Sequence, residues 1–189
     1  TAITALTTFG YKATNPLMGY ITDLRTTNAV LYTSNFYPGS SPLTPIAYTN
    51  NSTTIANTAY STLLLNGTTG GIVDQTRSID LESFGAAKVV NGFSPYLGTN
   101  YSTYHTGASS NYISTPANAA FNMSTSDFSI EFWVYPISQA GYSALLSFDS
   151  TGDYPICFYW GSSVNSGNIQ ASVGTTAAWF TNTSAMTFG

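Results

Sequence analysis

Charge is scarce in this chain. Asp, Glu, Lys and Arg together make up 6% of its 189 residues, against about 25% in ordinary globular proteins. The four basic residues are scattered along the sequence, and the formal net charge is −4. A surface that binds nucleic acid needs clustered positive charge to neutralise phosphates, so we expect no nucleic-acid partner. Thr, Ser, Asn and Gly supply the polarity instead, which suits a virion or extracellular assembly and equally a secreted β-protein.

Cysteine and histidine each occur once. Cys157 therefore cannot form an intrachain disulfide, and its apolar, strand-like surroundings at residues 154–160 predict a buried structural thiol. His105 lies in a segment rich in Tyr, Thr and Gly, and no Gly-x-Ser-x-Gly motif is present. Neither nucleophilic catalysis nor a transition-metal site is expected from these residues. We predict that His105 is a solvent-facing loop residue.

Long apolar runs and helical patterns are also missing. No stretch approaches the roughly 20 apolar residues of a membrane span, and no basic segment followed by an apolar one marks a signal peptide. One helical turn is expected around residues 118–122. The sequence is instead rich in strand-like segments separated by Gly, Asn, Ser and Pro, which predicts an all-β sandwich. We expect strands near residues 3–11, 19–26, 60–65, 88–90, 112–114, 128–135, 144–148, 156–160, 168–173 and 177–181.

The most informative segment is residues 125–136. Hydrophobic side chains alternate with others along it, so that one face of a strand carries Phe128, Ile130, Phe132 and Val134. The opposite face carries Ser129, Glu131, Trp133 and Tyr135. This period of two, with aromatic and β-branched residues, is typical of a strand that is half-buried in a sandwich. We expect Pro136 to end the strand, because proline has no N–H for the ladder.

This segment resembles a strand of laminin-G-like, concanavalin A-type jelly rolls. Residues 19–36 resemble the segment that closes such a domain in the repeat-rich structural proteins of bacteriophages, especially cyanophages, and residues 60–113 are similar to the opening of a repeat. The resemblance implies an all-β jelly-roll sandwich in a non-enzymatic structural or adhesive protein. A tail fibre or surface appendage of a phage virion would display such modules to host glycans. The competing hypotheses are an extracellular filament or adhesin subunit polymerised by strand exchange, and a stand-alone carbohydrate-binding module.

The closing segment precedes the opening one, so the expected organisation is unusual. Residues 1–36 would be closing strands, residues 37–59 a connector rich in Pro, Ser, Thr and Asn, and residues 60–189 the opening part of a jelly roll. A long loop on the sandwich surface is the alternative for residues 37–59. The sandwich would be completed by a later part of a longer fibre, by strands from a neighbouring subunit, or by its own N-terminal strands. We expect one of the first two, and hence a homo-oligomer, a polymer or a complex with other virion proteins.

Catalytic and metal sites are weakly indicated. A glycosidase needs two carboxylates in suitable positions. Glu131 stands alone in the middle of its strand, with Asp127 at the strand's start, so no catalytic residue is expected. Asp149 and Asp153 flank a Gly-containing loop and predict a possible calcium site, although the same pattern is typical of an ordinary hairpin turn.

Aromatic residues are the best material for a binding surface, because they make up 15% of the chain and Tyr and Trp offer amphipathic contact area. The candidate carbohydrate-binding residues are Tyr101, Tyr104, Tyr112 and Trp160. Packing in the core or between subunits is the alternative for each of them. Together these observations predict a virion or extracellular location, with host-surface glycans as ligands.

Overall fold

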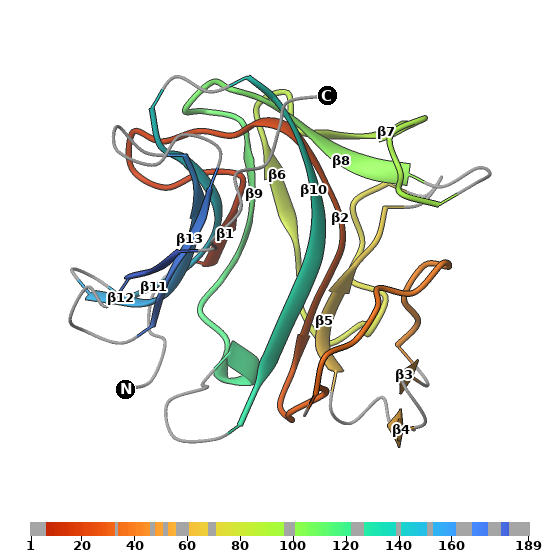
Figure 1. Ribbon diagram of the computed structural model, residues 1–189. Coiled ribbons are helices and arrows are strands. Elements are labelled where there is room, and N and C mark those ends of the chain that lie inside the picture. Colours follow the sequence, from red (N-terminus) through yellow and green to blue (C-terminus); the bar gives the residue numbers. More distant parts are fainter. Residues whose placement is uncertain are drawn as a thin grey trace.

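The computed structural model is all-β, with two large antiparallel sheets that are consistent with a β-sandwich (Figure 1). The expected fold class is thereby confirmed at this level. The structure describes residues 7–32, 34–45, 48–50, 53–55, 61–67, 71–96, 101–121, 127–138, 141–150, 153–161, 168–173 and 179–181.

One sheet has seven strands. They are β1 (Thr7–Phe9), β6 (Glu82–Phe84), β9 (Tyr112–Thr115), β11 (Ser143–Ser150), β12 (Asp153–Trp160), β13 (Ile169–Val173) and β14 (Trp179–Thr181). Their spatial order is β14-β13-β12-β11-β1-β9-β6. Strand β1 thus lies between β9 and β11, which follow it in the sequence by more than a hundred residues.

The other sheet has five strands, which are β2 (Met18–Thr27), β5 (Ser61–Leu65), β7 (Lys88–Asn91), β8 (Tyr101–Thr106) and β10 (Ser129–Ser138). Their order is β10-β2-β8-β7, and β5 also pairs with β2. A separate hairpin consists of β3 (Tyr48–Asn50) and β4 (Thr53–Ile55), and a 3-10 turn, η1, spans Ala119–Phe121.

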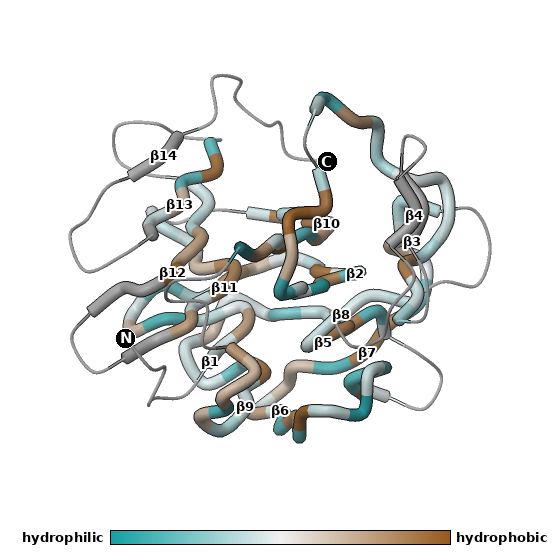
Figure 2. The backbone as a smooth tube through the Cα atoms, turned by 90° about the horizontal axis from the view of Figure 1, so that it is seen from below, coloured by the Kyte–Doolittle hydropathy of each residue, from teal (hydrophilic) through white to brown (hydrophobic). Residues whose placement is uncertain are grey.

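Hydrophobic side chains from both sheets meet in one core. Seen from below in Figure 2, the strands form two neighbouring rows, with β11, β1 and β9 in one and β10, β2 and β8 in the other. Cys157 is completely buried, as expected. The buried core includes Phe9, Leu17, Ile21, Leu24, Leu63, Leu65, Ile113, Phe121, Leu145, Leu146, Phe148, Ile156 and Trp160.

The alternation predicted for β10 is confirmed. Phe128, Ile130, Phe132 and Val134 pack against the core, whereas Trp133 and Tyr135 are exposed on the other face. The prediction that Pro136 ends the strand is wrong, since Pro136 pairs with Gly19 and the strand continues to Ser138. Proline is tolerated there because β10 lies at the edge of its sheet.

The N-terminal strands belong to the same sandwich as the rest of the chain. Strand β2 pairs with β10 on one side and with β8 and β5 on the other. Strand β1 pairs with β9 and β11. Residues 7–27 thus pair within their own chain, as in the third of the three possibilities, while completion by a later repeat or a neighbouring subunit stays a prediction.

The segment after β2 lies on the sandwich rather than away from it. The backbone N–H of Leu43 donates to Asp23, and the Asn66 side chain donates to the Leu43 carbonyl. Strands β3 and β4 form a hairpin within the segment predicted as a connector. These contacts favour the alternative of a surface loop.

Strand β8 was missed by the sequence pattern, which placed its residues in a loop. His105 is accordingly not solvent-facing, because it lies in β8 and is 0% exposed. Its imidazole ring sits against the backbone of Gly10, where an added Cβ would overlap the ring. The close approach of β8 and the end of β1 thus depends on a glycine.

We predict that Gly10→Ala destabilises the protein by at least about 2 kcal/mol. Gly10 has φ +78°, a region that an L-residue rarely adopts, and the methyl group would meet His105. Chemical denaturation measures the loss. Gly39→Ala is the control, because a Cβ there makes only an ordinary contact. Equal stability of the two variants would contradict the packing described for His105.

We also predict that stability falls in acid because of His105. Burial lowers its pKa from 6.5 to about 4, so the unfolded state binds more protons between these values. The His105 contribution to the free energy of unfolding is therefore constant above pH 6.5 and decreases as the pH falls to 4, by up to about 3 kcal/mol. The contribution is isolated by comparing the free energies of unfolding of the wild type and His105→Gln from pH 6.5 down to pH 4. A pH-independent difference would contradict the buried, neutral imidazole.

Candidate functional site

An aromatic row crosses the outward face of the five-stranded sheet. The strand register places Tyr104 of β8 opposite Tyr20 of β2, and Tyr20 opposite Tyr135 of β10. The ring of Tyr20 lies 5.0 Å from that of Tyr104 and 6.1 Å from that of Tyr135 between centroids. Three neighbouring strands thus present three tyrosines side by side, and we call them the tyrosine row.

A loop adds a fourth ring above this row. Phe93, which follows β7, stacks on Tyr20 with centroids 4.0 Å apart and ring planes 7° from parallel. Next to it is an open cavity of about 270 Å³, bounded by Phe93 and Pro95 on the loop side and by Trp133 and Tyr135 on β10. The lining is mostly apolar aromatic surface, which suits the flat face of a ring-shaped ligand.

A second cavity, of about 440 Å³, lies on the other side of Trp133. It shares Trp133 and Val134 with the first cavity, so the two are neighbours along β10. Its walls include Asp23, Glu131 and the aromatic rings of Tyr32, Phe36 and Tyr96. Carboxyl groups and aromatic rings therefore meet in one hollow.

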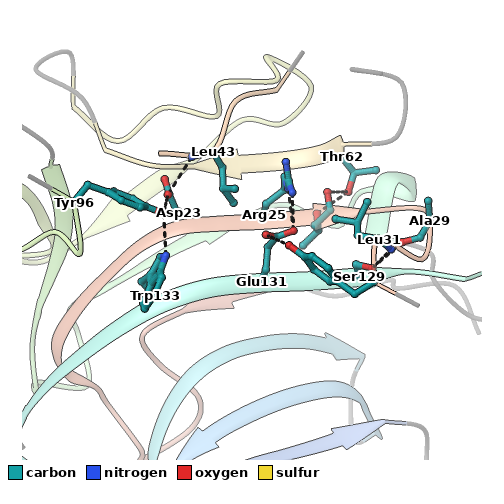
Figure 3. A network of polar contacts seen from close by, with 12 residues as sticks. Asp23, Arg25, Ala29, Leu31, Leu43, Thr62, Tyr96, Ser129, Glu131 and Trp133 are labelled. Atoms are coloured by element: carbon teal, nitrogen blue, oxygen red, sulfur yellow. Dashed lines mark hydrogen bonds and ion pairs between the residues drawn. The ribbon is translucent and has the colours of Figure 1, made fainter. Parts of the chain in front are cut away.

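A chain of hydrogen bonds supports the wall between the cavities (Figure 3). The Trp133 indole N–H donates to the Tyr96 hydroxyl at 2.9 Å, and this hydroxyl donates to Asp23 Oδ2 at 2.5 Å. The Leu43 N–H donates to the same carboxylate oxygen. Asp23 sits at φ +49°, beside a register irregularity between β2 and β10, so a local distortion of the strand turns its side chain toward Tyr96.

Burial is the largest influence on the pKa values of Asp23 and Tyr96 in this hydrogen-bond network. It raises the pKa of Asp23, although the hydrogen bonds from Tyr96 and Leu43 and the charge of Arg25 act in the opposite direction. Burial and the neighbouring Asp23 carboxylate also raise the pKa of Tyr96. Tyr96 therefore stays a neutral hydrogen-bond donor over the physiological range.

An ion pair beside these hydrogen bonds holds β10 against β2. The Arg25 guanidinium donates two hydrogen bonds to Glu131 Oε2, at 2.7 and 3.1 Å. The Tyr32 hydroxyl donates to Glu131 Oε1 at 2.8 Å. Arg25 is 1% exposed, so its charge is neutralised inside the protein, and both oxygens of Glu131 are engaged.

The structure separates the four candidate aromatic residues. Tyr104 belongs to the tyrosine row. Tyr101 lies three positions earlier on β8 and so points to the opposite face. Tyr112 lies on the other sheet, stacked on Tyr11 at 5.0 Å and on Phe84 at 4.7 Å. Trp160 is 0% exposed within the core, which contradicts a role in stacking on a ligand.

Asp149 and Asp153 lie near the facing ends of β11 and β12, which pair as an antiparallel hairpin. Their side chains lie outside the described part of the structure, so the calcium site stays a prediction. Among the residues that the structure describes, no group of three or more His, Cys, Asp and Glu side chains could hold a metal ion. The described segments also contain no helix long and apolar enough to cross a membrane.

Sequence reasoning missed most of this site. Tyr20 and Asp23 fall inside the motif at residues 19–36 without a prediction of their own, and no prediction covers Phe93 or Tyr96. One signal in the sequence could have found it. Tyr20 and Trp133 each occur at outward-facing positions of expected strands, where a large aromatic residue indicates contact with something other than the core. The pairing of these strands is what brings the residues together.

Comparison of the chain with protein-family models, with curated proteins and with solved structures finds no match. The resemblance to laminin-G-like repeats thus stays an expectation from the motifs. Function has to be argued from the surface itself.

We predict an asymmetric double-mutant cycle at the ion pair. Glu131→Met removes the carboxylate that accepts two hydrogen bonds from buried Arg25 and should cost about 3 kcal/mol. Arg25→Met should cost less, because Glu131 retains partial exposure. The double variant should be more stable than Glu131→Met alone. Additive losses in chemical denaturation would contradict a coupled, buried pair.

Proposed function

We propose that this chain is a non-enzymatic structural and adhesive protein of a phage virion, part of a tail fibre or surface appendage. Its sandwich would be a laminin-G-like jelly roll that binds host-surface glycans through the tyrosine row and the cavity beside Trp133. The virion assignment rests on the sequence motifs. Glycan binding rests on one structural observation, which is the continuous aromatic surface on the outward face of the five-stranded sheet.

The exposure of these rings is what favours a ligand. Tyr135 and Phe93 are 41% and 42% exposed, although aromatic residues of this size are usually placed in cores or interfaces. Sugar rings have apolar faces bordered by hydroxyl groups. Exposed aromatic side chains with Ser and Thr beside them match both parts. Thr22, Ser94 and Ser102 line the same cavity as the rings.

The nearby carboxylates fit a supporting role better than catalysis. Glu131 is held by Arg25 and Tyr32, and Asp23 is held by Tyr96 and Leu43. A glycosidase requires one carboxylate free to act as nucleophile or base and one acid placed at the scissile bond. Because both oxygens of Glu131 and Oδ2 of Asp23 are committed to protein contacts, we propose that bound glycans are retained rather than hydrolysed.

We predict that Tyr135→Ala lowers the affinity for a bound neutral glycan by about tenfold or more, because one stacking surface is lost. A glycan array identifies the ligand, and calorimetry then measures the affinity. Tyr142→Ala is the matched control, since Tyr142 is 42% exposed but precedes β11 of the other sheet. Binding of the wild type no stronger than background would reject the proposal, and so would equal losses in the two variants.

A subunit of an extracellular filament is the second candidate. The observation that favours it is β10, whose ten residues pair only with β2 among the strands that the structure describes. An edge strand of this length can template a strand from another copy. Sedimentation of the purified chain separates the two candidates. Concentration-dependent polymers would favour the filament, and a monomer of 20.1 kDa would count against it.

A further inference from the structure

The larger cavity has a composition of its own. Its walls combine the carboxyl groups of Asp23 and Glu131 with five aromatic residues, which are Tyr32, Phe36, Tyr96, Phe132 and Trp133. Phe36 is 42% exposed and Trp133 36% exposed, so both rings remain open to a ligand. With a volume of about 440 Å³, the cavity has room for a single ring-sized group.

The cavity has two carboxyl groups beside it but one guanidinium group to compensate them. Glu131 is compensated by Arg25, with 2.7 Å between Nη2 and Oε2. The hydrogen bonds to Asp23 come from neutral donors, the Tyr96 hydroxyl and the Leu43 amide. When Asp23 is ionised, the three charged groups, Asp23, Arg25 and Glu131, therefore sum to one negative charge. This charge sits behind the aromatic wall, where low polarity extends its range.

The hydrogen bonds connect that charge to the rings. Asp23 accepts from Tyr96, and Tyr96 in turn accepts from the indole N–H of Trp133 (Figure 3). A chain of this kind polarises its members, because each accepted hydrogen bond strengthens the next donor. Both rings become more electron-rich at the cavity wall. Aromatic rings with a carboxylate behind them attract a cation, and best an organic one that gives up water easily.

We propose that this cavity binds an organic ammonium group. While Asp23 is ionised an acidic group would be repelled, and a neutral group would gain only contact with the rings. The ammonium can come from an amino sugar within a glycan or from a small free amine. Only the first source rests on the proposed glycan-binding function, so the two proposals can fail separately.

The experiment compares three probes by calorimetry and Trp fluorescence at pH 7. They are a tetramer of glucosamine, the matching tetramer of N-acetylglucosamine, and tetramethylammonium. We expect the amino tetramer to bind about tenfold more tightly than its acetylated counterpart, because acetylation removes the positive charge. Tetramethylammonium alone should quench or shift Trp fluorescence. Equal affinity for the two tetramers, with no response to tetramethylammonium, would overturn the proposal while leaving neutral glycan binding intact.

Variants locate the site. Asp23→Asn keeps the size of the side chain and tolerates a positive φ, and it should weaken ammonium binding by about tenfold. Asp80→Asn is the matched control, because Asp80 is exposed and lines neither cavity. If both variants weakened binding equally, the ammonium would be attracted by the overall negative charge of the protein and not by this cavity, which would overturn the proposal.

A second variant keeps the test decisive if Asp23→Asn does not fold. Phe36→Leu removes an exposed ring that belongs to the larger cavity alone. It should lower the affinity for tetramethylammonium severalfold, since leucine has no π face. Unchanged binding in Phe36→Leu would contradict an aromatic ammonium site. A clear preference for the amino tetramer over tetramethylammonium identifies the glycan as the source, and similar affinities identify a small amine.

Discussion

The pairing of β2 on both of its edges is the constraint on which the rest of the structure depends. One edge of β2 pairs with β10 along nearly its whole length, and the other pairs first with β8 and then with β5. Tyr20 can join Tyr104 to Tyr135 only because β2 lies between their strands. The same pairing places Arg25 against Glu131. The N-terminal part of the chain therefore completes the five-stranded sheet and creates the candidate binding surface.

Local patterns in the sequence predicted the strands well where apolar and polar residues alternate. In β10 the alternation identified both the core face and the face that carries Trp133. It failed for β8, whose Ser, Thr and His side chains read as a loop and whose His105 is nevertheless buried. Burial of such residues is decided by the neighbouring strands and by the space at Gly10, and neither is a property of the local segment.

The candidate site was only partly predictable for a related reason. Tyr104 was recognised as an isolated aromatic residue, whereas its partners Tyr20 and Tyr135 lie more than 80 positions before it and about 30 after it. Glu131 was judged to stand alone because only its own strand was considered. A distortion at Asp23 on the adjacent strand brings a second carboxyl group to the same cavity. Contacts of this kind depend on strand order and register, which sequence periodicity does not specify.

Hydrogen–deuterium exchange of the chain with and without a saturating glycan tests the central claim most directly, which is that the outward face of the five-stranded sheet is the binding surface. The account predicts added protection in peptides covering β2, β10 and residues 92–96, with none in β11 and β12. Protection confined to the seven-stranded sheet, or spread evenly over both sheets, would contradict it.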